Sequence, residues 1–332
     1  MEVILVLGAI VIIVCGVHAW HESLISGYPG PRSALRHSSF DTPPITAVAI
    51  SPDQQAAISV GTAGVIRVHD LQSRKPSAEM ASRFREACAI AISPDGSQFI
   101  VGTGAGQIEV WIGDDICVPS INRQGHSGRI TSLAFHPDGQ SFLTCGDDQR
   151  NIFWDINTLE PLFELPSVSS AIHTVSFLAQ GKQLLTGNQH GQLQLWDLAT
   201  KKILSTTLVS SSAVVHDSII EGIAVLSDET EVLAVARSGE MGIWDLRTGE
   251  RKLKFRHPGQ PIASLCMLKN GRHVVTGGID GQIQIWNIQT GLCIRSIPAH
   301  AGTVLALEAT TDSQLLVSAG WDGTLKFWDL YP

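Results

Sequence analysis

Apolar and polar residues alternate with a period of two along most of this chain of 332 residues. Residues 130–155, with the sequence ITSLAFHPDGQSFLTCGDDQRNIFWD, are representative, because apolar runs are separated there by Pro-Asp-Gly and Gly-Asp-Asp turns. Alternation of this period, bounded by turn residues, predicts short β-strands with one buried face. The 31 Gly and 15 Pro residues suit the many tight turns that such strands need. The pattern therefore predicts an all-β protein.

One short pattern recurs along the chain at a nearly constant spacing. It is an apolar strand that ends in Trp, or once in His, and its seven copies are centred on His69, Trp111, Trp154, Trp196, Trp244, Trp286 and Trp328. Successive copies are 42, 43, 42, 48, 42 and 42 residues apart. Each unit has room for four antiparallel strands, and such a sheet cannot bury its apolar faces alone. We therefore expect seven sheets stacked around an axis.

This arrangement resembles the WD-repeat β-propeller family, whose repeats run about 40 to 45 residues. The resemblance covers residues 33–332 and implies a seven-bladed β-propeller of four-stranded antiparallel blades, preceded by one N-terminal hydrophobic helix. It also implies a hydrogen-bonded group inside a blade, made of a His, a Ser or Thr, an Asp and the Trp. Two units carry this whole group at identical spacing, namely His126, Thr144, Asp148 and Trp154, and His300, Ser318, Asp322 and Trp328.

A Ser, His and Asp together can also indicate a hydrolase. Here the set recurs at the repeat spacing, together with a Trp, and no GxSxG motif is present in the sequence. We therefore interpret both sets as structural networks in which buried polar atoms satisfy one another. The other units lack one or more of the polar members, so we expect apolar packing to hold those blades more than polar networks.

The last unit ends four residues after Trp328, which leaves it one strand short. In the sixth unit the fourth strand begins eight residues before His300, and Ser33 lies eight residues before Asp41, the matching position of the first unit. We predict that residues 33–38 close the ring as the outer strand of the seventh blade, because an open edge promotes aggregation. The expected domains are a hydrophobic anchor or signal at 1–20, a linker at 21–32, and the propeller at 33–332.

The resemblance implies that the propeller is a rigid platform for interactions. We expect the loops between the second and third strands, and those entering the first strands, to share one face around the central channel. Candidate partner-binding residues on that face are Trp321, Arg237, Arg129, Asp147, Gln189, Ile279, Arg85 and Gln260. Interfaces concentrate binding energy in Trp and Arg, and Arg binds carboxylates through its planar fork. The alternatives are that Trp321 packs against the next blade and that the arginines are solvated.

Residues 1–20, MEVILVLGAIVIIVCGVHAW, form an apolar segment without Lys or Arg. The core length and the Val-His-Ala sequence fit a cleaved export signal, but the cationic start of such a signal is missing. Kept as a helix, residues 3–20 would reach about 27 Å, enough for a thin bilayer. The nearest cations, Arg32 and Arg36, follow it, which favours the cytoplasmic side for the propeller. We therefore predict a single-pass membrane anchor with a cytoplasmic propeller; export to a periplasm or lumen is the alternative.

Charge and cysteine usage exclude several classes of site. The formal net charge is -8, and no run of like charges forms the basic face that nucleic-acid binding needs. The six Cys residues are single and widely spaced, so we expect no metal site, and we expect those after Cys15 to be small core residues. Paired carboxylates and phosphate loops are also missing from the sequence, so we expect no cofactor and no small-molecule substrate.

These observations together predict a non-catalytic protein-interaction scaffold that is tethered to a membrane through residues 1–20. Its loop-rich face would bind a protein partner or a multi-subunit complex at the membrane. The alternative is an exported propeller enzyme, or a small-molecule binder, that uses the central channel.

Overall fold

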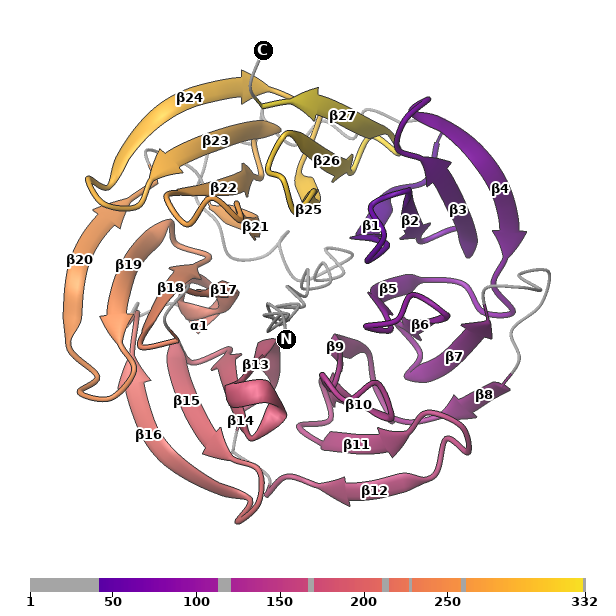
Figure 1. The fold of residues 1–332 in the computed structure, drawn as a ribbon, viewed down its shortest axis with the longest axis horizontal. Helices are drawn as coiled ribbons and strands as arrows, with labels where there is room; N and C mark the ends of the chain where they lie inside the picture. Colours follow the sequence, from indigo (N-terminus) through magenta and orange to yellow (C-terminus); the bar gives the residue numbers. More distant parts are fainter. Residues whose placement is uncertain are drawn as a thin grey trace, which may run out of the picture.

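A computed structural model describes residues 42–112, 121–166, 170–210, 215–226, 229–257 and 261–330. Within these residues the chain forms seven antiparallel sheets arranged as the blades of a ring around a central axis (Figure 1). Six sheets have four strands and the seventh has three, and in each blade the strands follow one another in sequence order from the axis outward. The seven-bladed, four-stranded β-propeller predicted from the sequence is therefore confirmed.

Blades 1 to 4 contain the first sixteen strands. Blade 1 consists of β1 (Ile45–Ile50), β2 (Ala56–Gly61), β3 (Val65–Asp70) and β4 (Lys75–Ala81). Blade 2 consists of β5 (Ala87–Ile92), β6 (Gln98–Thr103), β7 (Gln107–Ile112) and β8 (Ile121–Gln124). Blade 3 consists of β9 (Ile130–Phe135), β10 (Ser141–Gly146), β11 (Asn151–Asp155) and β12 (Pro161–Glu164). Blade 4 consists of β13 (Ile172–Leu178), β14 (Gln183–Asn188), β15 (Gln192–Asp197) and β16 (Lys202–Leu208), with the short 3-10 helix η1 (Ala179–Gly181).

Blades 5 to 7 complete the ring. Blade 5 consists of the short helix α1 (Val215–Ser218), then β17 (Ile220–Val225), β18 (Glu231–Ala236), β19 (Glu240–Asp245) and β20 (Arg251–Arg256). Blade 6 consists of β21 (Ile262–Met267), β22 (His273–Gly278), β23 (Gln282–Asn287) and β24 (Leu292–Pro298). Blade 7 consists of β25 (Val304–Ala309), β26 (Leu315–Gly320) and β27 (Leu325–Asp329).

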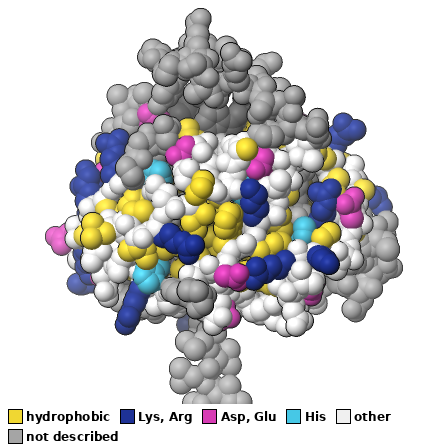
Figure 2. Space-filling view, turned by 90° about the horizontal axis from the view of Figure 1, so that it is seen from above, with side chains coloured by type: hydrophobic (Ala, Val, Ile, Leu, Met, Phe, Trp, Pro, Cys, Tyr) yellow, Lys and Arg dark blue, Asp and Glu magenta, His cyan; other side chains and the backbone are white. Residues whose placement is uncertain are grey.

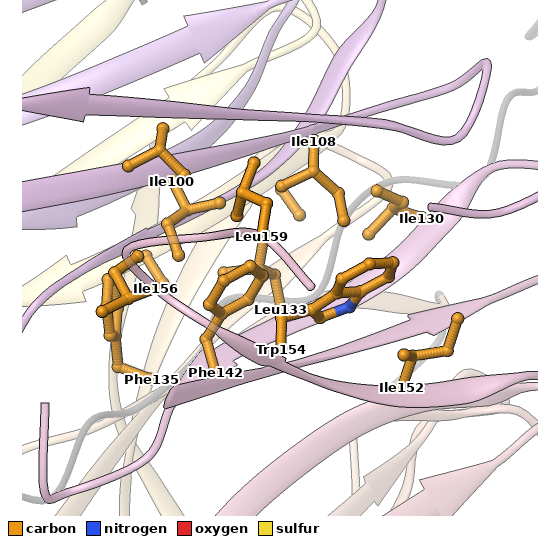
Figure 3. Packing of buried hydrophobic residues seen from close by; sticks show 13 residues of the cluster. Ile100, Ile108, Ile130, Leu133, Phe135, Phe142, Ile152, Trp154, Ile156 and Leu159 are labelled. Atoms are coloured by element: carbon orange, nitrogen blue, oxygen red, sulfur yellow. The ribbon is translucent and has the colours of Figure 1, made fainter. Parts of the chain in front are cut away.

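The core lies in layers between neighbouring blades. Between blades 2 and 3, Ile100 and Ile108 pack against Phe142 and Trp154, and all four side chains are at most 3% exposed (Figure 3). Burying one such side chain contributes about 1.5–3 kcal/mol. Because each layer draws on two blades, a blade buries its apolar faces only when both neighbours are present.

A β-bulge occurs at the second residue of the innermost strand in every blade. The bulged residues are Thr46, Cys88, Thr131, His173, Glu221, Ala263 and Leu305. Some of these side chains tie adjacent blades together, since the Thr131 hydroxyl donates to the Ile172 carbonyl (2.5 Å) and the Thr46 hydroxyl donates to the Ala87 carbonyl (2.5 Å). The bulges thus supply lateral hydrogen bonds close to the axis.

The first and last blades are in contact, which closes the described ring. Arg74, in the β3–β4 turn, pairs with Asp329 at the end of β27 (2.5 Å), and the Thr42 hydroxyl donates to the Asp322 carbonyl (2.8 Å). Residues 1–20, the linker at 21–32 and the predicted closing strand at 33–38 lie outside the described residues.

Candidate functional site

The polar group in blade 3 forms a continuous chain of hydrogen bonds. The Trp154 indole donates to the Thr144 hydroxyl (2.8 Å), and that hydroxyl donates to His126 Nε2 (2.7 Å). His126 Nδ1 donates to one oxygen of Asp148 (2.8 Å), and the other oxygen accepts the Ser127 amide (2.9 Å). Burial lowers the pKa of His126, so the ring is neutral and each nitrogen has one defined role. The loop that enters β9 is thereby held against the β10–β11 turn.

Blade 7 contains the same chain of bonds. The Trp328 indole donates to Ser318 (2.8 Å), Ser318 contacts His300 Nε2 (2.8 Å), and His300 Nδ1 donates to Asp322 (3.0 Å). Although burial opposes ionisation of Asp322, hydrogen bonds from Thr324, the Ala301 amide and His300 lower its pKa to about 2. The site is a carboxylate–imidazole–hydroxyl set whose hydroxyl is already engaged by an indole. This arrangement fixes loops rather than exposing a nucleophile.

The blades that depart from this pattern also contain polar contacts, and sequence reasoning missed one of them. In blades 4 and 6 the indole still donates to a threonine, in the pairs Trp196–Thr186 (3.1 Å) and Trp286–Thr276 (2.9 Å). In blade 2 the fully buried Glu109 accepts from the Ser82 hydroxyl (2.7 Å) and the Arg83 amide (2.8 Å). Blade 2 is packed mainly through apolar side chains, as expected, but it also contains this buried polar contact, which the sequence reasoning did not predict. The available signal was an acidic residue inside the apolar strand IEVWI.

The candidate partner-binding positions share one backbone contact. In each blade the residue just after the second strand donates its amide to the carbonyl of the residue before the first strand, at 2.8–3.1 Å. The seven donors are Thr62, Gly104, Asp147, Gln189, Arg237, Ile279 and Trp321. Six side chains of different chemistry, and a glycine in blade 2, are thus presented at equivalent places by the same backbone bond.

Trp321 is half-buried beside Gly302, whose φ of 146° lies in the left-handed region. A Cβ atom at Gly302 would lie 3.3 Å from the Trp321 Cβ, so the glycine leaves room for the indole. Ile279, in the neighbouring blade 6, is also half-buried and also belongs to the set of seven. This part of the face therefore offers apolar surface.

The charged candidates gather on blades 2 and 3. Asp147 is exposed, and its amide donates to the carbonyl of the half-buried Arg129 (2.9 Å). Although the residue is exposed as a whole, partial desolvation of its carboxylate raises the pKa of Asp147, and the nearby Arg129 charge opposes that shift. Arg85 is exposed at the entry to β5, while Gln189 is half-buried on blade 4. Gln260 lies outside the described residues.

Arg237 differs from the sequence-based expectation of a free carboxylate-binding cation. Its guanidinium group pairs with Glu221, the bulged residue of β17, whose side chain is only 5% exposed. Burial raises the pKa of Glu221, and the charge of Arg237 opposes that shift. The correction has a simple cause, because a buried carboxylate requires a nearby cation. Arg237 therefore neutralises Glu221 within the chain first of all, and any contact with a partner is additional to that role.

Cys117 lies outside the described residues, and the four described cysteines follow the core expectation with one exception. Cys88, Cys145 and Cys266 are buried, whereas Cys293 is exposed on the outer strand β24. Within the described ranges, no group of three His, Cys, Asp or Glu residues could hold a metal ion.

The blade pattern, the Trp-centred hydrogen bonds and the loop-rich face define a WD-repeat β-propeller. The sequence model of the family described as "Nucleolar protein 10-like, N-terminal domain" matches residues 122–328. The chain belongs to this family of β-propeller domains.

Several relatives are similar at low identity. Apoptotic protease-activating factor 1 of Rattus norvegicus is 22% identical over 74% of this chain, and target of rapamycin complex subunit wat1 of Schizosaccharomyces pombe is 22% identical over 60%. U3 small nucleolar RNA-associated protein 15 of Saccharomyces cerevisiae is 25% identical over 69%. The matches cover 19%, 64% and 43% of these relatives, which is less than two thirds of each.

The predicted location is wrong. The hydrophobic start of the chain led to a membrane-anchored propeller on the cytoplasmic side, whereas the matching family is named for a nucleolar protein and one relative for small nucleolar RNA. An apolar run shows that a segment avoids water, but it does not by itself identify a membrane. Among the helices of the described residues, none has the length and apolar character needed to span a bilayer.

Proposed function

We propose that this propeller is a non-catalytic scaffold that binds a protein partner through the face carrying the seven equivalent loop positions. The observation that supports this most directly is the shared amide bond, which holds six unlike side chains and one glycine on an unchanging frame. In a frame of this kind, a side chain that recognises a partner can change without loss of the backbone bond, because the side chains at these positions do not take part in it.

The face has two chemically distinct parts. Trp321 and Ile279 give an apolar part on blades 6 and 7, while Arg85, Arg129 and Asp147 give a charged part on blades 2 and 3. A buried aromatic anchor beside a polar rim is the usual composition of a protein-binding surface. We therefore expect a partner segment that places an aliphatic or aromatic side chain near Trp321 and a carboxylate near Arg129.

The partner belongs, in this proposal, to a multi-subunit assembly. Relatives are named as subunits of target of rapamycin complexes and as associated with U3 small nucleolar RNA. The family name favours a nucleolar ribonucleoprotein assembly. The net charge of -8 favours contact with the proteins of such an assembly and not with its RNA.

Quantitative co-purification of a tagged chain tests the proposal. We expect Trp321→Ala and Arg129→Glu each to remove the same set of co-purifying proteins, while Leu162→Ala, on the outer strand β12, retains it. Leu162 is a suitable control because its side chain is 53% exposed and lies away from this face. Equal recovery with Trp321→Ala and with the native chain would refute the proposed face, provided that thermal unfolding shows both to be folded.

A further inference from the structure

The outer strands of blades 4, 5 and 6 form a surface that we call the blade 4–6 rim, made of β16, β20 and β24. These strands carry six cations and no carboxylate: Lys202, Arg251, Lys252, Lys254, Arg256 and Arg295. By contrast, Glu79 lies on the outer strand β4 and Glu164 on the outer strand β12. Positive charge is therefore concentrated on one side of a chain whose formal net charge is -8.

The same rim carries most of the exposed aliphatic surface of the described residues. Of seven large hydrophobic side chains that are exposed there, five lie on β16 and β24: Ile203, Leu204, Leu208, Leu292 and Ile294. Leu292 and Ile294 are 65% and 57% exposed. Figure 2 shows the side of the ring where β24, β27 and β4 lie, which includes one of the three rim strands, and hydrophobic side chains are exposed there between Lys and Arg side chains. Exposed apolar side chains that are surrounded by charged side chains are typical of an interaction site.

Half of the rim cations are already paired. Arg251 and Lys254 contact Glu240, and Lys252 contacts Glu231. Within the described part of the chain, no carboxylate lies within ion-pair distance of Lys202, Arg256 or Arg295. Lys202 and Arg295 belong to the strands that carry the exposed aliphatic residues, and Arg256 belongs to β20, the outer strand of the intervening blade. All three can pair with carboxylates of another molecule.

These features favour a protein segment as the occupant. Nucleic acid would gain from unpaired cations but nothing from exposed Leu and Ile side chains, and only three cations are unpaired. The register shift between Ile285 and Trp286 places Ile294 in a bulge, which disfavours the addition of a fifth strand to β24. Contact through side chains is therefore favoured over contact through the strand edge.

We propose that the blade 4–6 rim is a second docking surface, which binds an acidic segment of a partner protein that also carries aliphatic side chains. The segment pairs its carboxylates with Lys202, Arg256 and Arg295 and covers Leu204, Leu208, Leu292 and Ile294. This surface is separate from the loop face, so the chain connects two partners at once.

Fluorescence anisotropy with the full chain tests the rim. The probes are a labelled peptide that alternates Glu and Leu, a peptide that alternates Lys and Leu, and a uridine-rich RNA. We expect the Glu–Leu peptide to bind most tightly, more weakly at high salt, and to protect the exposed Cys293 thiol from alkylation. Equal binding of the two peptides, or tighter binding of the RNA, would overturn the proposal.

Two substitutions separate this surface from the loop face. Arg295→Glu and Leu292→Asp should each weaken Glu–Leu peptide binding about fivefold, the effect of one strong surface contact. The matched control is Leu162→Asp on β12, which should leave the affinity unchanged. Trp321→Ala should also leave the affinity for the Glu–Leu peptide unchanged. The proposal for the rim and the proposal for the loop face can therefore fail independently of each other. Unaltered affinity in both rim variants would refute the rim.

Discussion

Arg237 and Glu221 form an ion pair with side chains that are 13% and 5% exposed. The pair joins the loop position of blade 5 to the bulged residue of its innermost strand. A residue that occupies a partner-facing position therefore also neutralises a buried carboxylate.

Removing one member of this pair should be more harmful than removing both. Arg237→Met leaves Glu221 buried without its cation and should lower the free energy of unfolding by about 3–5 kcal/mol. The double variant Glu221→Leu, Arg237→Met should recover most of that loss, because no uncompensated charge stays buried. Urea unfolding of the native chain and the variants measures both effects. A double variant as unstable as Arg237→Met would show that the pair has another role.

The two kinds of Trp-centred network should respond differently to loss of the hydroxyl. Thr144→Val leaves both the Trp154 indole N–H and the Nε2 atom of His126 without a partner, whereas Thr186→Val in blade 4 affects the Trp196 indole. Each unsatisfied buried group costs about 1–3 kcal/mol. We therefore expect Thr144→Val to be the more destabilising by at least about 1 kcal/mol. If chemical unfolding gave equal losses of free energy of unfolding for the two variants, the hydrogen bond to His126 would add little to the stability of blade 3.

Acid should weaken blade 7 in two ranges of pH. Burial lowers the pKa of His300 below 6.5 in the folded chain. The stability that neutral His300 contributes is therefore present above pH 6.5 and is lost as the pH falls below 6.5. The pKa of Asp322 is lowered from 3.8 to about 2, so its contribution is lost as the pH falls from about 4 towards 2. Asp322→Asn should reduce the dependence of the urea midpoint on pH below 4. An unchanged slope in that variant would contradict the assignment.

We propose that residues 33–38 supply the outer strand of blade 7. The support is that Thr42 bonds to Asp322 in the β26–β27 turn, so the preceding chain starts beside blade 7. A chain that begins at residue 33 should unfold at the same temperature as the full chain, while one that begins at residue 39 should unfold several degrees lower. Scanning calorimetry compares the two. Equal melting temperatures would refute closure by this segment.

Much of the fold was predictable from the sequence, because the spacing of Trp111, Trp154 and the later members repeats a unit that only a ring can bury. The place of the candidate loop residues was predictable for the same reason, since the blades share one backbone pattern. The two side-chain networks centred on His126 and His300 were predictable from their repeated spacing, but the pairing of Arg237 was not. Glu221 and Arg237 are 16 residues apart in a unit that lacks most of the family's polar group, and only the bulge in β17 brings them together.

Two further differences have physical causes that the sequence does not display. Cys293 lies in an apolar-looking strand, LCIRSIP, but that strand is the outermost of its blade and its side chains have little to pack against. The location was mispredicted because hydropathy reports only avoidance of water.

The amide bond that recurs at Thr62, Gly104, Asp147 and their four counterparts has a consequence for how this molecule can change. The bond uses only backbone atoms, so every L-amino acid except proline can make it. Except at Arg237, whose side chain neutralises the buried Glu221, single substitutions at these places can alter what the ring recognises while the ring itself stays folded. Evolution, or a designer, can therefore exchange one blade's contribution to specificity at a time.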